Sequence, residues 1–458
     1  GNGGDGNGDE PEKHGPWTLD AGTRQDGVIY KPNTAKNHQN TLLWGGRIAT
    51  GRPGGMSEAR ADFLIAGSTP LARLVAGLLA SMHGKTVVFS GESQSAYRLA
   101  RGIDLSVAPL TRPEKPCKAC LASASIRPRC TSMPDALMRA MPAPVVRGSG
   151  STIATNSRVT PETWALLRAS LPPMLKLLSR IGGRGSWSRV DPILFGETAA
   201  GKEALAHIRH MALAFDHGAE RVPERDIGPG RDGLLLRDAV LLHRPALEAA
   251  LDRWLDQHEI RRCGESDTLI VHDDGSAELV SGDSRIDIGQ TVLADDAAII
   301  AHMPGALWPP LLERRVASTI LTQPTRPIAS PVMQRIETGL TLAQQQAGRG
   351  IVAMGPGAID PFASSLGILL GSERGFRQAG QSSYEIVATR DGAPAVGRLR
   401  GAGPDVLAGL GPGGAFFAPA IARWLSGRAE AAEAAWLNAR LVDRDAQSSP
   451  VADFGAAA

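Results

Sequence analysis

Residues 62–72 read Asp-Phe-Leu-Ile-Ala-Gly-Ser-Thr-Pro-Leu-Ala, and this stretch decides the fold. The apolar run Asp62–Ala66 is typical of a buried strand, and residues 71–82 have the composition of a helix. A further apolar run over residues 85–90 predicts a second strand, parallel to the first. Together the three segments predict a βαβ unit that opens an α/β fold.

The turn between this strand and this helix matches part of the dinucleotide-binding pattern G-x-G-x-x-G/A. Gly67 suits the tight turn and Ala72 suits close helix packing, but Thr69 stands where a second glycine usually admits a pyrophosphate. The helix N-terminus still offers backbone N–H groups and a positive dipole end to an anion. A strand, turn and helix without a ligand is the alternative. The candidate contacts are Gly67, Ser68, Thr69, Pro70, Leu71 and Ala72.

A ribose-binding acid is expected about 20 residues after the first glycine, at the end of the second strand. That count reaches Ser90, and Glu92 follows two residues later. We expect Glu92 to bind the ribose from a slightly longer turn. The alternatives are a weaker contact through Ser90, or a solvated Glu92. Arg98 and Arg101 follow closely enough to reach a phosphate, although solvated arginines are equally common.

Glycine is dense near the end of the chain, in residues 392–399 and 409–419, before a helical stretch over residues 415–425. Such glycines let the backbone approach a flat or anionic ligand closely. Residues 291–297 predict a further strand and turn, with Ala294 and Asp295 as candidate contacts. The candidates in the glycine-rich segments are Gly397, Gly411, Pro412, Gly413, Gly414 and Ala415.

Three segments resemble, in this order along the chain, those of the FAD-dependent oxidoreductases with a glutathione-reductase-like nucleotide fold. They are the turn at residues 67–72, the strand and turn at residues 291–297, and the glycine-rich residues 392–419. The C-terminal glycines are similar to those of the D-amino-acid and glycine oxidases. The resemblance implies FAD as the cofactor, with its ADP part on the N-terminal βαβ unit and its isoalloxazine and ribityl part on the C-terminal glycines. Thr69 and the missing Gly-Asp-Ala pattern depart from related families and leave the reaction type open.

A closer resemblance rests on the Gly67 turn, residues 101–109 and residues 411–414. It is to the flavoprotein monooxygenase family that matures quinohemoprotein amine dehydrogenase. That family implies hydroxylation of a tryptophan in a small protein substrate during tryptophylquinone biogenesis. The implied partners are this small protein and another maturation enzyme. An FAD-dependent amine or amino-acid oxidase is the first alternative, and a non-catalytic nucleotide-binding accessory protein is the second. No catalytic side chain is identified.

The expected fold class is α/β, with a Rossmann-like FAD-binding domain and an interleaved α+β substrate domain. The glycine-rich residues 1–55 predict a disordered lead, with Met56 as the natural start and a docking arm as the alternative. The remaining expected parts are the FAD-binding segments 60–112, 230–300 and 385–427, the substrate domain over 113–229 and 301–384, and a C-terminal helix with a loose tail over 428–458.

Composition excludes several classes of function. The 49 basic and 47 acidic residues give a formal charge of +2, too even for a protein that neutralises a row of nucleic-acid phosphates. No apolar run approaches the roughly 20 residues that cross a bilayer, so no membrane partner is expected. The 4 cysteines in 458 residues favour a reducing compartment, and we expect a cytoplasmic protein.

Two small clusters invite a metal or redox interpretation. Cys117, Cys120 and Cys130 lie close together in sequence, but no second cysteine or histidine pair completes a zinc site. His207 and His210 lie three residues apart on an expected helix, where surface or core histidines are the usual outcome. We therefore expect unreactive thiols, ordinary histidines and no metal.

Overall fold

The computed structural model describes a large part of the chain after residue 58. All of the described residues belong to one compact unit, Met56–Ala458. None of the helices they form is long and apolar enough to cross a membrane. The predictions for residues 1–55, for Arg98 and for Cys117, Cys120 and Cys130 lie outside the described residues. The described residues are 59–92, 99–106, 161–344, 346–371, 376–447, 449 and 451.

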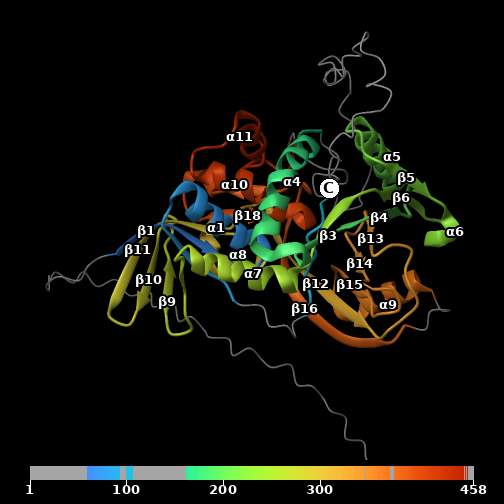
Figure 1. The fold of residues 1–458 in the computed structure, drawn as a ribbon, viewed down its shortest axis with the longest axis horizontal. Helices are drawn as coiled ribbons and strands as arrows, with labels where there is room; N and C mark the ends of the chain where they lie inside the picture. Colours follow the sequence, from blue (N-terminus) through green and yellow to red (C-terminus); the bar gives the residue numbers. More distant parts are fainter. Residues whose placement is uncertain are drawn as a thin grey trace, which may run out of the picture. The chain divides into compact units, whose positions relative to one another are not determined.

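Eight of the described strands form a first sheet with a parallel centre (Figure 1). Its order is β17-β18-β11-β1-β2-β8, and the hairpin of β9 and β10 pairs with β11. Strands β18, β11, β1, β2 and β8 are parallel to one another, whereas β17 pairs antiparallel with β18 and β10 pairs antiparallel with β11. The strands are β1 Ala59–Ala66, β2 Val87–Ser90, β8 Arg261–Arg262, β9 Thr268–Val271, β10 Ala277–Ser281, β11 Ser284–Leu293, β17 Ala395–Gly397 and β18 Asp405–Ala408.

A second sheet, also of eight described strands, is mostly antiparallel and has the order β16-β12-β15-β14-β13-β4-β6-β5. Only its β13–β4 pair is parallel among the described pairs. Two more strands, β3 Trp187–Val190 and β7 Ala239–Leu242, pair with each other. The second sheet comprises β4 Ile193–Gly196, β5 Ala219–Val222, β6 Asp232–Leu236, β12 Leu312–Thr322, β13 Val332–Arg335, β14 Thr341–Ala343, β15 Val352–Pro356 and β16 Gln378–Thr389.

Helices connect and cover both sheets (Figure 1). The longer ones are α1 Pro70–His83, α4 Pro161–Gly182, α5 Ala199–Ala214, α7 Arg244–Gln257 and α9 Ile359–Leu370. The shorter α-helices are α6 Glu224–Ile227, α8 Asp296–His302, α10 Ala418–Leu425 and α11 Ala431–Asn438. The 3₁₀ helices are η1 Gly183–Gly185, η2 Gly305–Leu307, η4 Leu399–Gly401 and η5 Gly411–Phe417.

The βαβ unit predicted from residues 62–90 is confirmed. Strands β1 and β2 are parallel, and Phe63 pairs with Val87. Helix α1 begins at Pro70 because Thr69 caps it, and proline suits a first helical position where the N–H would have no partner. It ends at Gly84, whose left-handed φ of 62° favours glycine. The α/β fold class, with a Rossmann-like domain and a second domain, follows from the two sheets.

One element is longer than the sequence predicted. The strand expected at the start of residues 291–297 is the end of β11, which begins at Ser284 and spans 10 residues. The predicted FAD-binding ranges 230–300 and 385–427 also include β6 and the end of β16, which both belong to the second sheet.

The two faces of the second sheet have different partners. Ile193, Met333 and Leu342 belong to an apolar cluster with Phe362 and Leu366 of α9. Residues on the opposite face, such as Leu194 and Leu234, belong to the main core, which includes apolar residues of α1, α4, α5 and α7. The second face is therefore the one that meets the elements of the first sheet.

Candidate functional site

Gly67 forms the turn between β1 and α1, and no other residue fits there. Its φ of +149° is rarely adopted by residues with a side chain. A Cβ at this position would lie 3.0 Å from Asp295 Oδ2 and 3.1 Å from the Ala72 Cβ. The Gly67 N–H donates to the Ser90 carbonyl at 2.8 Å, which joins the turn to the end of β2. The predicted roles of Gly67 and Ala72 in a tight, closely packed turn are thus observed.

The N-terminus of α1 has a regular cap. The Thr69 hydroxyl oxygen accepts from the Ala72 N–H at 3.4 Å. Pro70 has no N–H, and Leu71 lies in the first turn, where an amide has no intrahelical acceptor. This end of α1 therefore presents a backbone donor and a positive dipole end, as an anion site requires.

Asp295 occupies part of this turn, in a way that the sequence did not reveal. Its Oδ2 accepts from the Ser68 N–H at 2.6 Å, and its Oδ1 accepts from the Ala298 N–H at 2.9 Å, at the start of α8. The preceding Ala294 N–H donates to the Ala66 carbonyl at 2.8 Å. Both predicted residues therefore lie at the turn, but the Asp295 carboxylate already holds one of its amides.

Glu92 and its neighbours close over the turn from the end of β2. The Glu92 N–H donates to the Ser68 hydroxyl oxygen at 3.1 Å, while the Glu92 side chain is exposed. A Cβ on Gly91 would lie 2.2 Å from the Gly67 carbonyl oxygen, so Gly91 is also required here. Gly91 was not predicted from the sequence. The Gly-Glu pair directly after Ser90 indicates a close turn and could have identified it.

Arg73 is a second residue that the sequence analysis missed. It is fully buried in α1, and its Nε donates to Asp252 Oδ1 at 2.8 Å. Its other nitrogens donate to the Ser68 carbonyl and, at 3.1 Å, to the Glu92 carbonyl. The guanidinium carbon lies 5.7 Å from the Phe89 ring centroid. Arg73 therefore links the carbonyls of Ser68 and Glu92 to Asp252 on α7. In the sequence, Arg73 is a charged residue within an apolar helical run, and this pattern could have identified it.

The C-terminal glycine segment reaches the same end of α1. A Cβ on Gly414 would lie 3.8 Å from a Leu71 side-chain carbon, although the two residues are far apart in sequence. Gly411 has a left-handed φ of +56° and begins η5. The Pro412 carbonyl accepts from the Leu105 N–H at 2.8 Å. The turn of residues 67–72 and the segment 411–415 thus meet.

The other residues predicted in the glycine-rich segments, Gly397, Gly413 and Ala415, have different surroundings. Ala415 is fully buried in the core, and a Cβ on Gly413 would lie 3.6 Å from the Phe417 ring. Gly397 ends β17 with a φ of +82°, where a Cβ would lie 2.9 Å from a Leu441 side-chain carbon. Gly397 thus lies against the C-terminal part of the chain, and Ala415 lies in the core.

Arg101 contacts the second sheet. Its carbonyl accepts from the Tyr384 hydroxyl at 3.1 Å, and its guanidinium carbon lies 5.3 Å from the Tyr384 ring centroid. Burial raises the pKa of the Tyr384 hydroxyl. These contacts place Arg101 beside β16 of the second sheet, and its contact with a phosphate or with the flavin stays a prediction.

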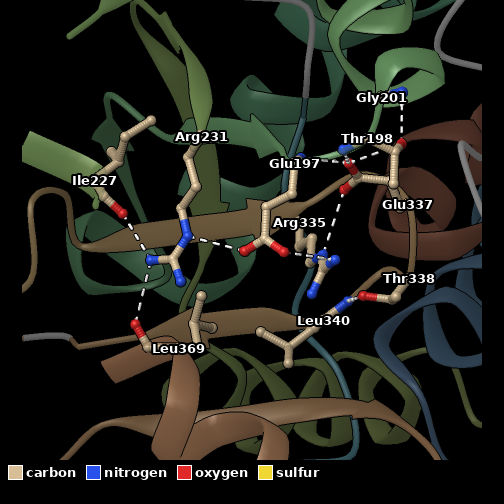
Figure 2. Close-up of polar contacts among 10 residues, drawn as sticks. All are labelled: Glu197, Thr198, Gly201, Ile227, Arg231, Arg335, Glu337, Thr338, Leu340 and Leu369. Atoms are coloured by element: carbon tan, nitrogen blue, oxygen red, sulfur yellow. Dashed lines mark hydrogen bonds and ion pairs between the residues drawn. The ribbon is translucent and has the colours of Figure 1, made fainter. Parts of the chain in front are cut away.

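A charged network fixes the far part of the second sheet (Figure 2). Glu337 Oε1 accepts from the Glu197 N–H at 2.5 Å and from the Thr198 N–H at 2.9 Å, at the start of α5. An Arg335 Nη lies 2.8 Å from Glu197 Oε2, and the Arg335 Nε lies 3.4 Å from Glu337 Oε2. Arg231 reaches Glu197 Oε1 at 2.9 Å. The network joins residues in or beside β6, β13 and α5. We call these residues, Glu197, Arg231, Arg335 and Glu337, the α5 clasp.

Two carboxyl groups near the site have raised pKa values. Burial raises the pKa of Asp296 to about 7, and the charge of Asp295 acts in the same direction. Burial also raises the pKa of Glu248 to about 6, although Arg244 and Arg73 oppose the shift. Both groups can exchange a proton near neutral pH.

The histidines and other potential metal ligands give a simpler result. Within the described ranges, no three His, Cys, Asp or Glu residues are grouped in a way that could hold a metal ion. His207 is half-buried and His210 is exposed, both on α5. Neither lies in an element that forms the α1 turn.

The fold and the site together define a class of protein. A parallel sheet carries a glycine turn at the N-terminus of its first crossover helix, and a C-terminal glycine segment meets that turn. A mostly antiparallel sheet is interleaved in sequence with the first sheet. This is a Rossmann-like α/β architecture with a second domain.

Comparison with known proteins identifies structural neighbours. No family model and no curated protein sequence matches the chain. NikD in its open form, an unusual amino acid oxidase essential for nikkomycin biosynthesis, is 13% identical, with a TM-score of 0.55 over 83% of this chain and 97% of that chain. Glycine oxidase from Geobacillus kaustophilus is 14% identical, with a TM-score of 0.53 over 81% of this chain and 96% of that chain.

A third neighbour is L-proline dehydrogenase from P. horikoshii. It is 12% identical, with a TM-score of 0.53 over 86% of this chain and 96% of that chain. At these identities the property shared with this chain is the fold. The architecture predicted from the sequence, two interleaved domains of which one is Rossmann-like, is confirmed.

Proposed function

We propose that this chain is an FAD-dependent oxidoreductase that oxidises an amine or an amino acid. The single observation that carries the proposal is the meeting of the α1 turn with the C-terminal glycine segment, where Gly414 lies against Leu71. The neighbours described as amino acid oxidase, glycine oxidase and proline dehydrogenase support the same class. They favour oxidation of an amine over hydroxylation of a tryptophan.

The residues at the turn fit a dinucleotide. Gly67 leaves no space for a side chain beside Ala72, and the first turn of α1 has an amide donor at Leu71. We propose that this turn holds the pyrophosphate and that residues 411–415 hold the flavin end. When bound, FAD supplies an acceptor for the hydride of a substrate C–H bond beside nitrogen. The chain's own residues bind and orient the cofactor and exclude water.

Asp295 is the feature that fits least well. Its carboxylate holds the Ser68 N–H, and no ion pair of Asp295 occurs among the described residues. A phosphate at this turn would meet a like charge, so its donors are proposed to be Thr69 and Leu71 rather than Ser68. Asp295 thereby lowers the affinity for the cofactor and fixes the α8 end of the site.

The more specific activity predicted from the sequence is that of a monooxygenase, which would hydroxylate a tryptophan of a protein partner. It rests on the sequence resemblance in residues 67–72, 101–109 and 411–414. No neighbour named above is described as acting on a protein side chain. The small protein partner, the second maturation enzyme and the cytoplasmic location stay predictions.

Anaerobic reduction separates the two activities. The purified full chain loaded with FAD is mixed without oxygen with glycine, L-proline or glycinamide, and the flavin absorbance near its visible maximum is followed. An oxidase or dehydrogenase of amines loses this absorbance with at least one of them. A flavoprotein that keeps its absorbance with every small amine, but is reduced by a nicotinamide nucleotide, would contradict amine oxidation and favour the monooxygenase.

A further inference from the structure

Gln334 on β13 has a buried side chain with an unsatisfied polar atom. The residue is 4% exposed, and its Oε1 has no hydrogen-bond partner among the described residues. A buried amide without a partner is costly and rare in native structures, because the group has lost its water. Such an atom is expected where a ligand or a bound water completes the site.

Gln334 lies in a row of buried residues that crosses the second sheet. It pairs with Thr341 on one side and with Leu194 on the other. Thr341 pairs with Met354, which in turn pairs with Thr319. All five residues are buried, and none carries a charge. Directly paired residues point to the same face, so this row offers hydroxyl, thioether and amide groups but no cation.

This face of the sheet contacts residues 100–105, which in turn contact the C-terminal glycine segment. The Thr319 hydroxyl donates to the Ala100 carbonyl at 2.6 Å. Val332, two residues before Gln334 and therefore on the same face, packs in a cluster with Leu105. The Leu105 N–H donates to the Pro412 carbonyl at 2.8 Å. The row thus adjoins the segment proposed to hold the flavin end of the cofactor.

The strand that carries Gln334 is held firmly from its other face. Arg335, the next residue, points to that face and forms the ion pairs with Glu197 and Glu337 shown in Figure 2. Met333, the preceding residue, packs in the apolar cluster under α9. Gln334 therefore cannot easily move to find a partner elsewhere, and its position is set before a ligand binds.

We infer that Gln334 binds an uncharged amide group of the substrate. A carboxamide presents an acceptor and a donor side by side, which matches the N–H and C=O of another amide. A free carboxylate would require a cation, and none of the five buried residues of this row carries one. Arg221, further along the same row, is exposed, and Arg101 packs on the Tyr384 ring. The inference rests on the proposed function, because it places the substrate of the same enzyme, and it specifies an amine that carries an amide rather than a free amino acid.

Gln344 provides a matched control. It is also 4% exposed, but its Oε1 accepts from the Ile328 N–H at 2.9 Å and its Nε2 donates to the Arg349 carbonyl at 2.8 Å. Gln344 is a buried glutamine with a structural role. The substitution Gln344→Met removes satisfied hydrogen bonds, whereas Gln334→Met removes an unsatisfied group of the same size.

The experiment compares the full chain, Gln334→Met and Gln344→Met. FAD content is measured first, then the change in flavin absorption on titration with glycinamide and with glycine, and then the melting temperature without either probe. The wild-type chain is expected to bind glycinamide more tightly than glycine. Gln334→Met should weaken glycinamide binding by about tenfold and keep or raise the melting temperature, because it removes the unpaired amide. Gln344→Met should lower the melting temperature and keep the preference for glycinamide.

Three outcomes would overturn the inference. They are tighter binding of glycine than of glycinamide by the wild-type chain, unchanged glycinamide binding in Gln334→Met, and a melting temperature of Gln334→Met as low as that of Gln344→Met. The proposed function fails separately, when the wild-type chain binds no FAD. In that case the melting temperatures with and without glycinamide still test the amide contact.

Discussion

Helices α1 and α5 each begin beside a carboxylate from a distant part of the chain, and comparing the two ends separates a structural contact from a candidate ligand site. At α5, Glu337 accepts from the amides of Glu197 and Thr198, and Arg335 balances its charge. At α1, Asp295 accepts from one amide of the turn, that of Ser68, and from the Ala298 amide at the start of α8, and no ion pair balances its charge among the described residues.

The helix caps are otherwise alike. Thr198 caps α5 by accepting from the Gly201 N–H at 3.0 Å, as Thr69 does for Ala72 in α1. A Cβ on Gly201 would lie 2.2 Å from Glu337 Oε1, so the α5 carboxylate is packed into the chain. At α5 the carboxylate of Glu337 occupies two amides before the helix, whereas at α1 Asp295 occupies the Ser68 amide and the Leu71 amide in the first turn has no intrahelical acceptor.

The largest expected effect comes from breaking the α5 clasp. Glu337→Ala removes the acceptor of two amides and one of the two ion pairs of Arg335, which keeps the pair with Glu197. We expect the free energy of unfolding to fall by about 3 kcal/mol or more, measured by urea denaturation. The exposed Glu220, paired with Arg237, provides the control, and Glu220→Ala should change stability little. Equal losses in the two variants would remove the distinction between a clasp and a surface pair.

A substitution in the α1 turn should affect the ligand rather than the clasp. Gly67→Val places side-chain atoms against Ala72 and Asp295, in a backbone conformation that valine avoids. FAD affinity is expected to fall by about 100-fold or more, which is ~2.7 kcal/mol, in a fluorescence titration. Gly305→Ala is the control, since nothing lies within 4 Å of an added Cβ there. Full FAD retention by a folded Gly67→Val variant would mean that the cofactor binds elsewhere.

The charge of Asp295 can be removed with little change in shape. Asp295→Asn keeps an oxygen that can accept from a backbone amide, but no longer repels a phosphate. FAD affinity should rise about 5-fold, or ~1 kcal/mol, and the gain should shrink at high salt. Asp283→Asn, which alters an exposed loop carboxylate, should leave the affinity unchanged. Weaker binding in Asp295→Asn would show that the carboxylate supports the cofactor site.

A separate prediction concerns Asp296 and pH. Its pKa is raised to about 7 in the folded chain, well above the ordinary value of an aspartate side chain, because burial disfavours the charged form. The folded state therefore holds this proton more tightly than the unfolded state, and stability falls as pH rises from about 4 to about 7. Asp296→Asn should raise the melting temperature at pH 8 and change it little at pH 4. A gain that is the same at both pH values would contradict a raised pKa.

The sequence predicted those parts of the fold and site that depend on local patterns. The apolar runs around Gly67 predicted β1, α1 and β2, and Gly67 with Ala72 predicted the tight turn that joins β1 to α1. Local periodicity and glycine spacing were sufficient for these features.

The remaining features depend on contacts between distant residues. The bond from Ser68 to Asp295 joins positions 227 residues apart, and nothing in either local pattern marks it. Glu337 reaches Glu197 across 140 residues in the same way. The satisfied Gln344 and the unsatisfied Gln334 look alike in sequence, because only the folded surroundings distinguish them.

The measurement that tests the central claim most directly is the FAD content of the purified full chain. The protein is titrated with FAD, the unbound cofactor is removed, and the visible spectrum and the released nucleotide are quantified. The account predicts flavin bands and one FAD for each chain, lost in Gly67→Val and kept in Gly305→Ala. A folded chain that stays colourless and takes up no FAD would contradict the cofactor site, and with it the proposed oxidation of an amine.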